Sequence, residues 1–288
     1  MHSSETTYLK KSINILKLPP MEVVFLKIMK KVTEVLVGIF FPANLNCIIC
    51  DMPISRKNRY SLCGHCADEM NFIQDACVIC GKPILNLSLD EENYTQCCPY
   101  CKGKKFLFDR NISFIEYDEV SKNLIFNLKY RGKTYLSKII AEIMYDRILA
   151  VNPEEFEKAD FIMYVPLARQ RQKERGFNQS EKIAEHLSRI SEISLNRGII
   201  RKRNTKKLHH IKSDGRKKEL SGAFSIVEEE KENICGKNVI LVDDIFTTGS
   251  TVNEISKELR LCGVERITVF TLLTGKYVKG VDKEDEIY

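Results

Sequence analysis

The chain has 288 residues, of which 43% are hydrophobic and 29% charged, with 11 cysteines, no tryptophan and a formal net charge of +6 at pH 7. This composition excludes a wholly disordered or collagen-like chain, and the length suffices for about two domains with cores of their own. The most apolar stretch, residues 35–43, is far shorter than a membrane span, and residues 1–20 lack the apolar core of a secretory signal. We therefore expect a cytoplasmic protein without a membrane span.

Four segments are expected in chain order. Residues 1–46 form an extension with an amphipathic helix, residues 47–104 a double zinc ribbon, residues 105–275 an α/β domain and residues 276–288 a tail. The positive charge is concentrated at residues 201–218, which hold nine Lys or Arg and one Asp, so the rest of the chain is slightly negative. Such a segment is either a solvated loop or a surface for phosphate, pyrophosphate or nucleic acid.

The cysteine module consists of four pairs with a gap of two residues. The eight thiols are Cys47, Cys50, Cys63, Cys66, Cys77, Cys80, Cys98 and Cys101. Two such turns supply four thiolates to one tetrahedral ion, so the module predicts two structural zinc ions, although iron uses the same ligands. Sequential grouping into two sets of four is the simplest assignment, and a cross-braced grouping would use the same residues. Cys98 is preferred over Cys97 because it keeps the two-residue gap.

The α/β domain alternates apolar strands with helices of 3.6-residue periodicity. Strands are expected at 112–115, 161–165, 239–242 and 267–273, and helices at 120–128, 136–143, 183–190 and 254–261. This alternation predicts a mostly parallel sheet with helices on both faces. Ligands in such sheets bind beyond the carboxyl ends of the strands.

The strand at 239–242 leads into two adjacent carboxylates, Asp243 and Asp244, and then into a loop of small polar residues before a helix. Backbone N–H groups at a helix N-terminus bind a phosphate dianion, and Gly249 lets the backbone approach it closely. The two carboxylates can accept hydrogen bonds from vicinal hydroxyls. A sugar with a 5′-phosphate satisfies both halves, whereas a Walker A loop is excluded because no Gly-Lys-Ser/Thr in the chain stands four residues after another Gly.

Residues 242–251 resemble the phosphoribosyl-pyrophosphate signature of type I phosphoribosyltransferases. The larger order is similar to the ComF family, in which a double zinc ribbon precedes a phosphoribosyltransferase domain. The stretches that carry this resemblance are the cysteine pairs, Leu128–Gly132, Val165–Leu167, Arg175–Gln179, Gly222–Phe224 and residues 243–249. The fold class implied is a type I phosphoribosyltransferase-like parallel sheet, preceded by the double ribbon.

The resemblance also implies roles for individual residues. Asp243 and Asp244 would bind the ribose hydroxyls and count as catalytic, and the diphosphate would carry Mg²⁺. Residues 201–218 would be the mobile loop over the active site, with Leu208 and Glu219 where the family usually has Gln and Asn. The other residues expected to bind phosphoribosyl diphosphate are Thr247, Thr248, Gly249, Ser250, Thr251, Arg169, Arg175 and Arg216. For Arg175, the residues alone leave open whether it binds an anion or forms an ion pair.

Two functions follow as hypotheses. The first is a phosphoribosyltransferase that uses 5-phosphoribosyl 1-diphosphate and an unknown base acceptor. The second is a non-catalytic protein that binds single-stranded DNA during DNA uptake, with a competence helicase as partner. The resemblance implies the second role, and the basic segment is compatible with it.

Overall fold

A computed structural model describes residues 46–84, 98–203 and 213–275, with only the backbone of Ser213, Asp214, Arg216 and Lys217. The chain divides into the units Met1–Leu45 and Asn46–Tyr288. The expected amphipathic helix of the extension and the tail at 276–288 lie outside the described residues. In the described part of the chain, no helix combines the length and the apolar character needed to cross a membrane.

The centre of the second unit is a parallel sheet of five strands. Its order is β1 (Arg110–Glu116), β7 (Arg266–Thr274), β6 (Asn238–Phe246), β2 (Phe161–Tyr164) and β3 (Ser194–Leu195). All neighbouring pairs are parallel, with Val239 beside Phe161 on one side and beside Ile267 on the other. β7 is buried along almost its whole length, because both faces of the sheet are covered. The predicted parallel α/β fold is confirmed.

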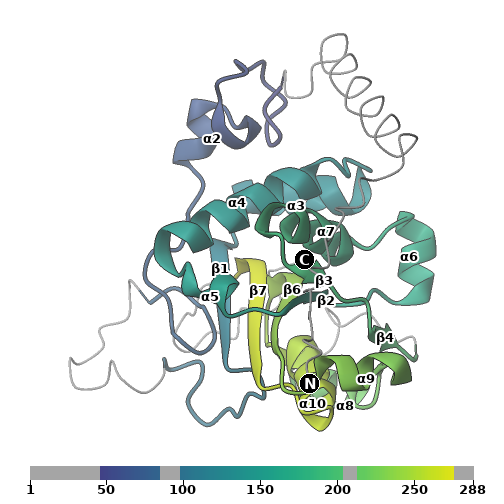
Figure 1. Ribbon diagram of the computed structural model, residues 1–288. Coiled ribbons are helices and arrows are strands. Elements are labelled where there is room, and N and C mark those ends of the chain that lie inside the picture. The colour runs from purple at the N-terminus through teal and green to yellow at the C-terminus, as the bar shows by residue number, and fades with distance from the viewer. Residues whose placement is uncertain (1–45, 85–97, 204–212, 276–288) are drawn as a thin grey trace, which may run out of the picture. The chain divides into compact units, whose positions relative to one another are not determined.

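The helices α3 (Glu119–Tyr130), α4 (Leu136–Val151) and α7 (Gln179–Ser191) cover one face. They lie together on one side of the strands in Figure 1. Ile240 and Val242 of β6 belong to the core on this side. α3 starts at a capping box, in which the Asp118 carboxylate accepts from the Ser121 backbone N–H and the Ser121 hydroxyl accepts from the Asp118 N–H.

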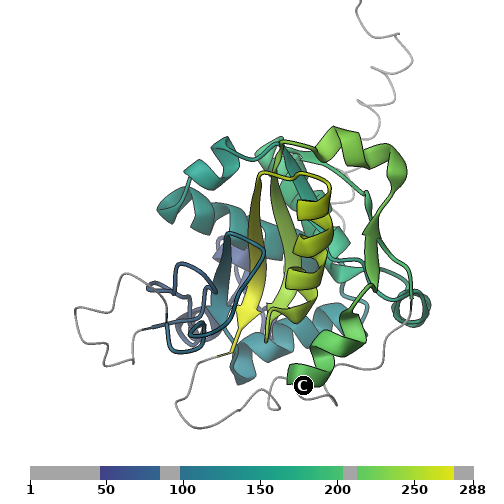
Figure 2. The ribbon, with the colours of Figure 1, turned by 90° about the horizontal axis from the view of Figure 1, so that it is seen from below.

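The opposite face carries α10 (Ser250–Leu261) and the antiparallel pair β4 (Ile199–Arg201) and β5 (Phe224–Ile226). Val239 and Leu241, which alternate with Ile240 and Val242 along β6, belong to the core on this side. Seen from below in Figure 2, α10 runs beside the yellow strand β7.

The two halves of the cysteine module join different cores. Ile48 and Met70 of the first half are buried with α3 and α4, whereas Tyr100 of the second half is buried with α10, together with Phe108 just after the module. The segment between the halves and the first turn of the second half run along the outer edge of β1, where Ile73 N–H donates to Phe114 O at 3.0 Å and Asn111 N–H donates to Ile79 O at 2.7 Å. The module therefore pairs with an edge strand that would otherwise be open.

Several elements differ from the sequence-based expectation. β6 continues through both acidic residues to Phe246, and α10 begins at Ser250 rather than Glu254. The stretch 201–218 was expected to be a loop, but it begins at the end of β4 and its last residues lie in α8 (Ser213–Leu220). Lys, Arg, Glu and Leu favour a helix there. Residues 204–212, Leu208 among them, lie outside the described part.

Short helices complete the structure. They connect the larger elements and include one basic helix beside the predicted site, α6. The remaining elements are η1 (Arg59–Ser61), α2 (Gly64–Asp68), α5 (Glu154–Glu157), α6 (Arg169–Arg175) and α9 (Glu228–Ile234).

Candidate functional site

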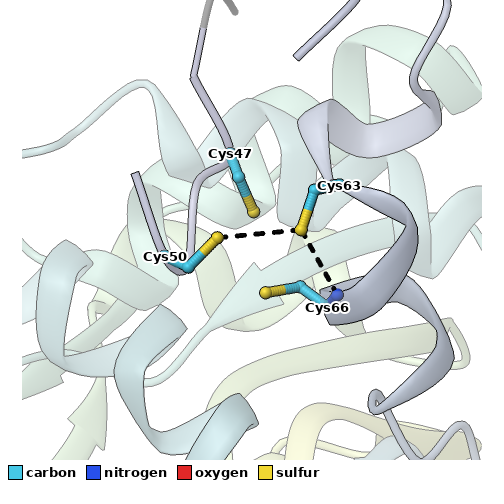
Figure 3. A group of neighbouring side chains, drawn as sticks. All are labelled: Cys47, Cys50, Cys63 and Cys66. Atoms are coloured by element: carbon cyan, nitrogen blue, oxygen red, sulfur yellow. Dashed lines mark hydrogen bonds between the residues drawn. The ribbon is translucent and has the colours of Figure 1, made fainter. Parts of the chain in front are cut away.

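The eight predicted cysteines form two groups of four. The first contains Cys47, Cys50, Cys63 and Cys66, and the second Cys77, Cys80, Cys98 and Cys101, with all sulfurs of a group within 4.8 Å of one another. Figure 3 shows the first group, in which the four thiols come from two turns of the chain. This is the sequential grouping, and it includes Cys98; Cys97 lies outside the described residues.

The spacing of the sulfurs fits a tetrahedral metal centre. Four thiolates bound at about 2.3 Å to one zinc ion lie about 3.8 Å apart. The Sγ atoms of Cys50 and Cys63 are 3.7 Å apart, and those of Cys80 and Cys98 are 3.6 Å apart. The donor set, four thiols and no other side chain, is typical of a structural zinc site and leaves no open position for catalysis.

The acidic pair lies near the carboxyl end of β6, and Asp244 is bound by a lysine. The Lys129 ammonium of α3 is 2.5 Å from Asp244 Oδ2, and both side chains are only 10% exposed. Gln179 Nε2 donates to the same oxygen at 3.1 Å. Asp243 Oδ1 accepts from the Ser180 hydroxyl at 3.1 Å and from the Asp244 N–H at 2.9 Å. The N-terminal turn of α7 and the last turn of α3 thus hold the pair in place.

The two carboxyl groups have opposite pKa shifts. Burial, and secondly the charge of Asp244, raise the pKa of Asp243 to about 8. Burial also acts to raise the pKa of Asp244, but the Lys129 ammonium outweighs it and holds that pKa below its ordinary value. Asp243 therefore keeps its proton to a higher pH than Asp244, whose carboxylate form is stabilised by Lys129.

The predicted phosphate loop follows directly. Gly249 has a φ of +74° and precedes α10, and a Cβ there would lie 2.7 Å from Phe246 Cζ, so only glycine fits without a shift. The hydroxyls of Thr248 and Ser250 are 2.8 Å apart and hydrogen-bonded to each other. Thr247 and Thr251 complete the loop and the first turn of the helix.

The second half of the cysteine module and the residues just after it pack against this loop. The Tyr100 hydroxyl, inside the Cys98–Cys101 pair, donates to the backbone carbonyl of Thr247 at 3.1 Å. Phe106 would be 3.2 Å from a Cβ on Gly249, and Leu107 N–H donates to Asn253 Oδ1 at 2.7 Å. The loop is therefore packed against the cysteine module as well as against its own strand and helix.

The predicted arginines have different surroundings. Arg175 does not bind an acid directly: it donates to Gln179 Oε1 and to the Tyr130 hydroxyl, at 3.1 Å each. Arg169 is exposed at the start of α6, and within the described structure it contacts neither the acidic pair nor the loop. The side chain of Arg216 lies outside the described residues. Arg201, from the basic stretch, is near enough to Asp243 for their charges to interact, and burial lowers its pKa to about 10.

Sequence reasoning did not assign three residues that hold the pair: Lys129, Gln179 and Ser180. Lys129 and Gln179 lie in stretches that carried the family resemblance, but no role was given to them. A physical signal was available, because adjacent carboxylates on a buried strand require a nearby cation.

Comparison with known proteins finds the same two parts of the chain, the cysteine module and the α/β domain. Residues 163–287 match the family model described as a phosphoribosyl transferase domain, and residues 36–103 match the double zinc ribbon domain. Competence protein F of Haemophilus influenzae is 30% identical over 74% of this chain and 84% of that protein. DNA utilization protein YhgH of Salmonella typhimurium is 28% identical over 78% and 95%, and competence protein ComFC of Bacillus subtilis is 26% identical over 80% and 95%.

Proposed function

This chain belongs to the ComF family, in which a double zinc ribbon accompanies a phosphoribosyltransferase domain, and on that premise we propose that it binds 5-phosphoribosyl 1-diphosphate. The observation that carries the proposal is the pair of the partly buried Asp243 and the buried Asp244, placed near the end of β6, shortly before the loop of residues 247–251. A structural role does not account for two adjacent carboxyl groups at a largely buried position, because each opposes the ionisation of the other.

The proposed contacts follow from the chemistry of the groups. Asp243 and Asp244 accept hydrogen bonds from the ribose hydroxyls, and the N–H groups and hydroxyls of residues 247–251 bind the 5′-phosphate at the start of α10. Arg169, exposed on α6, is available to the diphosphate, whereas Arg175 orients Gln179 and through it Asp244. Mg²⁺ bound with the ligand would neutralise the diphosphate charge.

Calorimetry on the double variant Asp243→Asn, Asp244→Asn tests the proposal. We expect loss of phosphoribosyl-diphosphate binding with the fold retained. Asp68→Asn with Glu69→Gln is the matched control, because it removes two adjacent carboxylates that are exposed in the cysteine module. Unchanged affinity in the site variant would reject the assignment.

Transfer to a base is the proposed activity of this pocket. The bond between the anomeric carbon and the diphosphate oxygen breaks, the pyrophosphate leaves with the electron pair, and a base nitrogen bonds to the carbon and releases its proton. Preorganised positive charge around the leaving group favours this step. Pyrophosphate release in the presence of a panel of bases measures it.

Binding of single-stranded DNA is a second candidate. Its support is the names of two relatives, a competence protein and a DNA utilization protein, together with the basic, exposed surface of α6. Exposed Arg169 and Lys173 can contact phosphates without sequence preference. Arg169→Gln with Lys173→Gln should weaken DNA binding and reduce the slope of log affinity against log salt by roughly 0.7 per lost contact. An unchanged slope would exclude α6 as the DNA surface.

A further inference from the structure

Within the described part of the chain, the exposed aromatic side chains fall in one short stretch, residues 126–135. Among the described residues, the exposed large hydrophobic side chains include three aromatics, and these are Phe126, Tyr130 and Tyr135. Phe126 is 45% and Tyr130 62% exposed, although both lie on α3, whose opposite side is buried in the core. Clustered exposed aromatics are unusual on a surface that has no partner, and often mark a binding site.

Two of these rings form a pair flanked by arginines. The ring centroids of Phe126 and Tyr130 are 5.2 Å apart, one helical turn from each other. The guanidinium of Arg131 lies 5.7 Å from the Phe126 centroid, and that of Arg175 lies 4.9 Å from the Tyr130 centroid. Aromatic rings combined with arginine planes are the surface on which nucleobases stack, because each base offers a flat π-face and polar edges.

The pair is connected to the acidic site by two short routes. Lys129, the neighbour of Tyr130 in the chain, binds Asp244. The other route runs through side chains: Arg175 donates to the Tyr130 hydroxyl and to Gln179, and Gln179 donates to Asp244, at 3.1 Å in each case. The exposed rings therefore lie at the border of the acidic site and not on a remote surface.

We propose that Phe126 and Tyr130, with Arg131 and Arg175, form a stacking surface for the ring of a nucleobase beside the acidic pair. The core of the domain does not need these rings, because α3 buries the residues on its other side, such as Leu124 and Leu128. If the surface binds the acceptor base of the phosphoribosyl pocket, the inference rests on the proposed function. The same ring chemistry is found in a free base and in a base of single-stranded DNA.

2-Aminopurine is a suitable probe for stacking on this surface, because its fluorescence is quenched by stacking and the chain contains no tryptophan to interfere. The full-length protein is titrated against the free base, with and without phosphoribosyl diphosphate and Mg²⁺, and against a short single strand that carries the same base. Quenching of the free base identifies an acceptor site. Quenching of only the strand identifies DNA as the source of the ring.

Variants show whether the rings of Phe126 and Tyr130 cause the quenching. Phe126→Ala with Tyr130→Ala should weaken the binding of the quenched probe roughly tenfold or more. Tyr130→Phe removes the hydroxyl that accepts from Arg175 but keeps the ring, so this variant should still bind the probe. Leu149→Ala is the matched control, because Leu149 is also 45% exposed, on α4, and lies outside the ring pair.

The outcome separates this inference from the proposed function. Calorimetry with phosphoribosyl diphosphate on Phe126→Ala alone should give wild-type affinity, because this variant leaves the acidic pair and the contacts among Tyr130, Arg175 and Gln179 in place. If neither probe is quenched, or both bind the double variant as well as the wild type, the stacking surface is wrong even where phosphoribosyl diphosphate binds. Conversely, quenching that depends on the rings supports the surface even if phosphoribosyl diphosphate does not bind.

Discussion

At the scale of single residues, the site is controlled by the charges around two carboxyl groups. Lys129 pairs with Asp244 and lowers its pKa, while burial and the charge of Asp244 raise the pKa of Asp243. These opposite shifts let β6 carry two adjacent acids, one buried and one partly buried, with Lys129 balancing the charge of Asp244. The pair is stable only as long as this lysine is present.

Replacement of Lys129 by Met should destabilise the protein by about 3 kcal/mol, because it leaves the buried Asp244 charge without its partner. Adding Asp244→Asn to this variant should recover part of the loss, since the uncompensated charge is removed. Urea unfolding of both single variants and of the double variant gives the coupling energy. Simple addition of the two single effects would mean that the lysine and the acid do not interact.

The stability of the protein should depend on pH through Asp243. An unfolded Asp loses its proton near pH 4, whereas folded Asp243, facing Asp244, Lys129 and Arg201, keeps it to about pH 8. The contribution of Asp243 to the free energy of unfolding is therefore complete below pH 4 and is lost as the pH rises through about 8. Asp243→Asn should flatten the decrease in melting temperature between pH 5 and pH 9. If the variant follows the wild-type curve, Asp243 ionises normally.

At the scale of elements, the turn from β6 to α10 depends on tight packing around one glycine. Gly249 faces the Phe246 ring from the strand and the Phe106 ring from the segment that follows the cysteine module. Strand, loop and helix are therefore fixed relative to one another before any ligand is present. Such preorganisation is what a phosphate site needs, because loop ordering would otherwise reduce affinity.

Gly249→Ala should reduce both stability and phosphoribosyl-diphosphate affinity. Gly222 provides the control, because its φ of +64° imposes the same left-handed backbone, while nothing lies within 4 Å of its Cβ position. Both substitutions strain the backbone, but only that at Gly249 forces a phenyl ring to move. The difference in unfolding free energy should be about 1–3 kcal/mol. Equal losses at both positions would show that backbone strain alone matters.

At the scale of the whole molecule, the cysteine module is divided between the two faces of the sheet. The first tetrad joins the core under α3 and α4, and the second joins the core of α10 and contacts the phosphate loop through Tyr100. The two metal centres should therefore differ in their influence on the ligand site, although their ligand sets are the same.

Cys80→Ser should lower phosphoribosyl-diphosphate affinity more than Cys47→Ser does. Both thiols are fully buried, so the local cost of the substitution is matched. Loss of the second centre releases the Cys98–Cys101 pair and with it the Tyr100–Thr247 hydrogen bond. Metal content shows which site is lost, and calorimetry gives the affinity. Tyr100→Phe should reproduce part of the effect with two metal ions retained; equal affinities in all three variants would contradict the coupling.

Local patterns in the sequence were enough for the architecture and for the residues that follow each other in the chain. Hydrophobic periodicity located the central strands and the long helices, and the two-residue gaps identified the eight cysteines. Both patterns involve residues that are close in the sequence. Such residues share a turn or a face independently of the rest of the chain. The order Asp243 to Thr251 likewise placed acids and loop together.

Contacts between distant segments were decided only by the tertiary structure. Lys129 binds Asp244, which lies 115 residues further along the chain. The two meet because α3 packs on one face of the sheet and brings the lysine to the acid on β6. Tyr100 meets Thr247 because the second tetrad lies on the other face, and the sequential grouping of the thiols required the fold as well. No local pattern encodes such pairs, because the partners are brought together by burial of whole apolar faces and not by any interaction along the chain.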